Sequence, residues 1–161
     1  MRPEVRERWE AALSSEAVRD RWASKVVLVP GSDCLWWLGA ISGRGHGRFW
    51  VGPDHVVIAH RFAFAMVRGV EALEDARLLG HRCDNPLCQR IDDDHVGVST
   101  ARRNRLEWLH RRDWVDSPLA DPRGARGRAE VLRRLARSDP FGVRIEIEKI
   151  RASLPEQLTL W

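Results

Sequence analysis

The spacing of apolar and polar positions predicts helical and extended segments in the first half of the chain. Residues 3–24 carry apolar side chains at helical spacing, and Ser14 and Ser15 mark a candidate break in this helix. Residues 26–29 form a short β-type run. In residues 34–58 apolar runs flank a Gly-rich turn, which predicts an antiparallel sheet.

The second half continues with a strand pair and several helices. We expect a helix over residues 60–67, and strands over residues 78–81 and 95–98 that pair across a polar loop. An Arg-rich helix is predicted over residues 101–112, and a basic helix and a short helix over residues 143–153 follow it. These elements predict an α+β fold, in which a small antiparallel sheet is flanked by an N-terminal helix and a basic helical arm.

Length and composition narrow the class of protein. With 161 residues, 43% of them hydrophobic, the chain is long enough to bury one core of ordinary size. No apolar run approaches the ~18 residues that span a membrane, and charges stand where a signal peptide needs an apolar run. We therefore expect a cytoplasmic protein with no membrane partner. In a reducing compartment its three cysteines favour metal binding over disulfides.

The distribution of charge points to a nucleic-acid partner. The net charge is only +4, and an excess of Arg over Lys is also what a GC-rich coding sequence produces. Residues 101–137, however, hold 11 basic and 5 acidic residues, whereas residues 71–100 hold 3 basic and 7 acidic ones. Genomic bias does not predict this placement, and Arg suits phosphate recognition. DNA contacts are expected from the arginines of the first basic helix: Arg102, Arg103, Arg105, Arg111 and Arg112.

The cysteines and a histidine have the spacing of a metal site. Cys83 and Cys88 are separated by four residues, His95 follows seven residues later, and Cys34 stands far upstream. Three sulfur ligands and one nitrogen ligand favour a tetrahedral structural zinc ion. His60 is a rival fourth ligand. The alternative is that the cysteines are small buried apolar residues.

His81 and Asn104 are candidates for hydrolytic chemistry. A neutral His near a phosphodiester can take a proton from water, because its ordinary pKa lies near working pH. Asn104 stands at the start of the Arg-rich helix and offers an amide oxygen to a hard divalent cation such as Mg²⁺ or Mn²⁺. A helix cap or a solvated side chain is the other interpretation of Asn104.

The order of these motifs resembles the HNH, or ββα-metal (His-Me finger), endonucleases, in particular their zinc-bearing members and the related His-Cys box homing endonucleases. The resemblance covers residues 34–108. It implies that His81 is the general base, that Asn104 holds the catalytic cation, and that Arg48 or Arg61 contacts the scissile phosphate. It also implies a structural zinc site made by Cys34, Cys83, Cys88 and His95. The motifs that carry it are CLWWLGA, GRGHGRF, AHR, HRCDNPLC, HV and ST followed by Asn104.

Two departures from the family pattern bear on activity. Many HNH proteins have Asp before the base histidine, whereas this chain has Gly80, and the loop before His95 is about two residues longer. Asp92, Asp93 or Asp94 could supply a carboxylate, although an acidic surface turn explains them as well. From the motifs taken together we expect a metal-dependent DNA endonuclease that nicks DNA in the nucleoid. The alternative is a catalytically inactive zinc-dependent DNA-binding module or a clamp-associated adaptor.

The domain organisation completes these expectations. We expect an N-terminal helical segment over residues 1–24, a nuclease domain over residues 25–116, a basic helical arm over residues 117–153 and a peptide tail over residues 154–161. The tail ends in QLTLW, which is similar to the peptide by which bacterial repair and replication proteins dock on the DNA sliding clamp. The anchor residues of such docking are Gln157, Leu158, Leu160 and Trp161.

Overall fold

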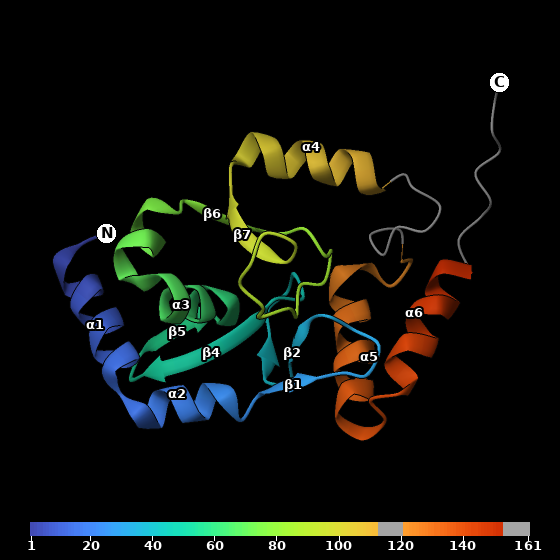
Figure 1. The fold of residues 1–161 in the computed structure, drawn as a ribbon, viewed down its shortest axis with the longest axis horizontal. Coiled ribbons are helices and arrows are strands. Elements are labelled where there is room, and N and C mark those ends of the chain that lie inside the picture. Colours follow the sequence, from blue (N-terminus) through green and yellow to red (C-terminus); the bar gives the residue numbers. More distant parts are fainter. Residues whose placement is uncertain (113–120, 153–161) are drawn as a thin grey trace.

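The computed structural model describes residues 1–112 and 121–152 as a mixed α+β structure (Figure 1). It contains small antiparallel sheets and six helices in these residues. The helices are α1 (Pro3–Ser14), α2 (Glu16–Ala23), α3 (Ala59–Asp75), α4 (Ala101–Arg112), α5 (Gly124–Ser138) and α6 (Gly142–Ala152). The strands are β1 (Val26–Leu28), β2 (Leu35–Trp37), β3 (Ala40–Ile41), β4 (Gly47–Gly52), β5 (His55–Ile58), β6 (Leu78–His81) and β7 (Val96–Ser99).

The strands of the described residues are divided among three sheets, so the antiparallel sheet predicted within residues 34–58 is confirmed for β3 to β5, whereas β2 belongs to another sheet. β1 pairs with β2, β3 to β5 form a second sheet, and β6 pairs with β7. The reason is a distant partner for β2: the backbone N–H of Trp37 donates to Leu87 O at 3.0 Å, and the N–H of Gln89 donates to Leu35 O at 2.8 Å. Residues 87–89 thus occupy an edge of β2 that an extended sheet would use.

The predicted helices are confirmed, and one of them is longer than expected. The break at Ser14 and Ser15 separates α1 from α2, and Ser15 Oγ accepts the N–H of Val18 at 3.4 Å as the cap of α2. α3 runs well beyond the expected residues 60–67, because the chain resumes its helix after a kink at Gly69, where φ is 87°.

The hydrophobic core contains residues from the N-terminal, central and C-terminal parts of the described chain. Trp37 and Phe62 are 0% exposed and Phe49 is 1% exposed, and the ring of Phe49 packs against both. Trp9 of α1 stacks on Phe62 from one side, while Leu132 of α5 belongs to the same cluster. The N-terminal segment and the C-terminal helices therefore share one core with the central residues.

The hairpin of β6 and β7 leads directly into α4, as expected from the sequence. The register pairs Leu78 with Ser99 and His81 with Val96, and the N–H of Asn104 donates to Thr100 O at 2.8 Å in the first turn of α4. In Figure 1 α4 lies above this hairpin, and α5 and α6 lie side by side at the end of the molecule opposite α1. None of the helices in the described ranges is long and apolar enough to cross a membrane.

Candidate functional site

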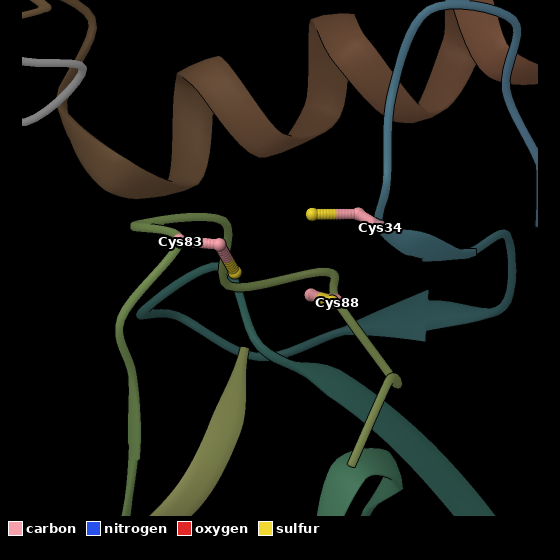
Figure 2. A group of neighbouring side chains, drawn as sticks. All are labelled: Cys34, Cys83 and Cys88. Atoms are coloured by element: carbon pink, nitrogen blue, oxygen red, sulfur yellow. The ribbon is translucent and has the colours of Figure 1, made fainter. Parts of the chain in front are cut away.

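Three cysteines from distant parts of the sequence meet beside β2 (Figure 2). Cys34 directly precedes β2, Cys83 follows β6, and Cys88 forms a β-bridge with Trp36. The three Sγ atoms lie within 4.8 Å of one another, and Cys34 and Cys88 are buried. The hydrogen bonds between β2 and residues 87–89 hold two of the three cysteines in place. This group could hold a metal ion.

The three thiols do not ionise alike. Side-chain hydrogen bonds from Cys83 and Cys88 hold the pKa of the Cys34 thiol far below its usual range, although burial opposes this, and the nearby Asn85 side chain lowers it further. The S–H groups of Cys83 and Cys88 donate to the Cys34 thiolate, which raises the pKa of both. A divalent cation bound by the three sulfurs would favour the thiolate form of all three.

The ring of His95, the predicted fourth ligand, is held by Asp92. Its Nδ1 is 2.8 Å from Asp92 Oδ1, which also accepts the backbone N–H groups of Asp94 and His95 at 3.0 and 2.9 Å. Its nitrogens are not among the atoms within 4.8 Å of one another in the cysteine group. After the hydrogen bonds and burial described above, His95 is the last of the causes that act on the pKa of the Cys34 thiol, and it lowers it. Nε2 remains for a metal, as is usual when a carboxylate holds the other nitrogen.

A second site is a cleft of about 630 Å³ that contains both His81 and Asn104. His81 Nε2 is 3.3 Å from the backbone oxygen of Cys88. Because a carbonyl oxygen only accepts, Nε2 carries the proton and Nδ1 keeps its lone pair. Burial, and then the charge of His46, lower the pKa of His81, although the bond to Cys88 raises it. His81 is therefore a neutral imidazole with a free acceptor nitrogen at neutral pH.

Gly80 explains how Asn104 reaches this strand. A Cβ at position 80 would lie 3.2 Å from Ser99 Cβ and 3.3 Å from Asn104 Oδ1. Both contacts are tighter than ordinary van der Waals separation, so a longer side chain such as Asp would displace the Asn104 amide. The glycine thus leaves the amide oxygen of Asn104 next to the residue that precedes His81. Asp92, Asp93 and Asp94 are not among the described residues that line the cleft, and Asp92 instead holds the turn before β7.

Two further histidines surround His81, and the sequence did not single out their grouping. The ring centroids of His60 and His46 lie 4.6 and 5.4 Å from that of His81. His60 is 5% exposed, its Nδ1 has no hydrogen-bond partner in the described part of the chain, and burial followed by His81 and His46 lowers its pKa well below the usual range. His60 is therefore grouped with His81 rather than with the three cysteines. In the sequence, only the position of His46 within the Gly-rich turn could have pointed to a role for it.

The predicted arginines lie outside the cleft, while others line it. Arg48 is exposed on β4 and Arg61 half-buried on α3, and among the described residues neither lines the cleft. Arg102, Arg103 and Arg105 are exposed on α4, and Arg111 and Arg112 form its last turn. The arginines that line the cleft are Arg44, Arg123, Arg126 and Arg128. Sequence reasoning missed these four, because their elements meet only in the folded chain. Gln157, Leu158, Leu160 and Trp161, which the sequence predicts as anchors for a sliding clamp, lie outside the described residues.

The chain is similar to proteins of Escherichia phage T7. It is 29% identical to "Protein 2.8" over 86 residues, which cover 53% of this chain and 55% of that protein. It is 28% identical to "Protein 7.7" over 112 residues, which cover 70% of this chain and 74% of that protein. The chain thus spans about half the length of Protein 2.8 and about three quarters of Protein 7.7. No family model matches the chain, and no solved structure matches it.

Proposed function

We propose that the protein is a metal-dependent DNA endonuclease of the HNH type. The observation that carries this proposal is that one strand–strand–helix unit, β6–β7–α4, brings His81 and Asn104 into the same cleft. His81 ends the first strand and Asn104 stands in the first turn of the helix, which is the order expected from the resemblance. The hydrogen bond from His81 Nε2 to the Cys88 carbonyl leaves Nδ1 as the proton acceptor.

In the proposed reaction a water molecule attacks the phosphorus atom of a DNA phosphodiester. His81 Nδ1 takes the proton of the attacking water, the bond from phosphorus to the 3′ oxygen breaks, and the 3′ oxygen takes a proton from solvent. The products are a 3′ hydroxyl and a 5′ phosphate. Asn104 Oδ1 would hold Mg²⁺ or Mn²⁺, which stabilises negative charge on the leaving 3′ oxygen. One such site makes one nick.

A zinc ion at the cysteine group would hold the loop that orients His81. Cys88 supplies both a sulfur to the group and the carbonyl oxygen to which His81 binds. Cys34, Cys83, Cys88 and His95 together match the ligand set of structural zinc. Fixing Cys88 therefore fixes the direction of the His81 ring, so the structural metal and the catalytic base are connected through one residue.

The arginines provide the expected contacts with the DNA backbone. Arg102 and Arg105 are exposed on α4, and Arg44 is exposed on the Gly-rich turn that lines the cleft. Contacts of this kind dominate affinity and weaken as salt rises. Arg48 and Arg61 remain the arginines that the resemblance assigns to the phosphate, and Arg44 is a third candidate for the same role.

The test is nicking of supercoiled plasmid by purified protein with Mg²⁺ or Mn²⁺. His81→Ala and Asn104→Ala should each lower the nicking rate by about 100-fold or more, because each removes a group that acts in the transition state. Both variants should keep their zinc content. His55→Gln is the matched control, because His55 packs against Trp9 outside the cleft, and its rate should equal that of the wild type.

The outcomes separate the proposed functions. Undiminished nicking by His81→Ala would refute its assignment as the base. A wild-type protein that binds DNA and zinc but cuts nothing with either cation would support the inactive DNA-binding module in place of the endonuclease.

We further propose that the C-terminal QLTLW peptide docks on a bacterial sliding clamp. A Gln, two Leu and a Trp at this spacing can fill an apolar groove on a partner. Deleting residues 157–161 should abolish binding to purified clamp and leave zinc content and plasmid nicking unchanged. Equal clamp binding by the full and the shortened chain would show that the sequence match is a coincidence.

A further inference from the structure

A small cavity separates the cysteine group from α5. Its volume is about 140 Å³, and Cys34, Cys83 and Asn85 line it together with Arg128 and Leu132 of α5. In Figure 2 α5 is the brown helix that passes above Cys34 and Cys83. Residues 83–88, here called the metal loop, thus face α5 across this cavity.

Two buried hydrogen-bond donors on the cavity lining lack an acceptor in the described structure. They are Asn85 Nδ2 and Arg128 Nη1. The orientation of the Asn85 amide is fixed, because its Oδ1 accepts the N–H of Leu87 at 3.0 Å. Arg128 is 3% exposed, and its Nη2 donates to Asp84 O at 2.6 Å. A buried donor without an acceptor destabilises the folded state, so such a pair beside three sulfurs needs an explanation.

We propose that Asn85 and Arg128 surround the metal centre without binding the metal, and that they donate N–H···S hydrogen bonds to the thiolates of Cys34 and Cys83. Cysteines that bind a metal do so as thiolates, and thiolate sulfur accepts hydrogen bonds that a thiol accepts poorly. Three thiolates, a neutral His and a divalent cation carry one net negative charge, which the Arg128 guanidinium balances in a buried place. This inference extends the metal centre proposed above and does not require that the protein cut DNA.

Because Arg128 belongs to α5, its hydrogen bond to a metal-bound thiolate makes metal binding and the docking of α5 stabilise each other. By linkage, the free energy that Arg128 adds to metal binding equals the free energy that the bound metal adds to the docking of α5. Two other contacts of α5 do not involve the metal: Arg133 Nη1 donates to Gly39 O at 2.7 Å, and Arg137 donates to Leu38 O. Loss of the metal is therefore expected to loosen α5 rather than release it.

The same helix connects the metal to the cleft. A Cβ at Gly45 would lie 2.7 Å from Ala125 O of α5, so the Gly-rich turn rests directly on this helix. His46 is the next residue of that turn, and its ring centroid is 5.4 Å from that of His81. The position of α5 thus sets the position of a histidine that lines the cleft with His81.

The first test is the zinc affinity of the full chain, measured by competition with a chromophoric chelator of known affinity. Arg128→Met should raise the dissociation constant for Zn²⁺ by about 10–100-fold, which is the usual effect of losing a residue that hydrogen-bonds to a metal ligand. Arg133→Met is the matched control on the same helix, since it loses a backbone contact away from the cavity and should stay within about 3-fold of the wild type. Equal affinities of Arg128→Met and Arg133→Met would overturn the proposal.

A second variant and a spectrum guard against a merely structural effect. Asn85→Asp keeps the acceptor for Leu87 but replaces the donor with a carboxylate, so it should also weaken Zn²⁺ binding. With Co²⁺ in place of Zn²⁺, loss of an N–H···S bond should move the thiolate-to-metal charge-transfer band to lower energy in Asn85→Asp and Arg128→Met. The band should not move in Arg133→Met. An unchanged band in both cavity variants would refute the N–H···S bonds, whatever happens to stability.

Hydrogen exchange tests the coupling to α5. Removing zinc from the wild type should speed amide exchange in residues 124–138, and the same treatment of Arg128→Met should change it much less. Exchange that responds only in the metal loop, with α5 unaffected in the wild type, would contradict the coupling.

Discussion

Gly45 is the point where α5 and the Gly-rich turn meet, and replacing it with alanine tests that contact. Its φ is +82°, and a Cβ would lie 2.7 Å from Ala125 O and 3.1 Å from Ala129 Cβ. The left-handed conformation costs another residue about 1–2 kcal/mol, and relieving the overlap with backbone costs about 1–3 kcal/mol more. We therefore expect Gly45→Ala to lower the free energy of unfolding by about 2–5 kcal/mol.

Two other glycines separate these contributions. Gly69 has φ +87° and ψ 167°, a conformation almost confined to glycine, but no atom within 4 Å of its Cβ position, so Gly69→Ala should cost only the conformational part, about 1–3 kcal/mol. Gly43 lies in the same turn as Gly45 with open space and no positive φ, so Gly43→Ala should be neutral or stabilise by up to ~1 kcal/mol.

Urea unfolding followed by tryptophan fluorescence and circular dichroism gives the three free energies. If Gly45→Ala costs no more than Gly69→Ala, α5 does not rest on the turn, and the connection from α5 to His46 described above is wrong. If Gly43→Ala costs as much as Gly45→Ala, the whole turn is sensitive to substitution, and the overlap with Ala125 is not the cause.

Two further predictions concern the core and the C-terminal helices. Phe62→Ala removes a fully buried ring and should lower the free energy of unfolding by about 3–5 kcal/mol, whereas Val67→Ala, at a 58% exposed position of the same helix, should change it by less than ~0.5 kcal/mol; urea unfolding checks both. Although burial raises the pKa of Asp121, hydrogen bonds from Arg123 lower it overall, so its stabilising effect is present above about pH 4 and is lost as the pH falls further. Asp121→Asn should therefore be less stable than the wild type near neutral pH and approach it in acid, and a constant difference across this range would contradict the reasoning.

The parts of the structure that sequence reasoning predicted are those with local causes. The break at Ser14 and Ser15 follows from the capping preference of Ser, and it separates α1 from α2. The hairpin of residues 78–81 and 95–98 and the helix from Ala101 follow from period-two and helical spacing over short stretches. The grouping of the three cysteines was also predictable, because the spacing of Cys83, Cys88 and His95 indicates a metal site that a distant cysteine can complete.

The parts that sequence reasoning missed depend on partners far away in the chain. β2 pairs with β1 and with residues 87–89, and no local pattern records which edge a short apolar strand will use. His46 and His60 join His81 only because the Gly-rich turn and α3 pack together. Arg128 is one of many arginines in the sequence, and only its burial beside Asp84 and the cysteines distinguishes it.

The distance along the chain between the cysteines sets the order in which the protein can mature. Cys34 and Cys83 are 49 positions apart, and Arg128 follows another 45 positions later. A ribosome must therefore release most of the chain before the three sulfurs can meet, and more again before α5 can cover them. Uptake of the proposed metal would accordingly be a late event of biosynthesis, so a cell short of that metal would accumulate chains that are fully translated yet unfinished.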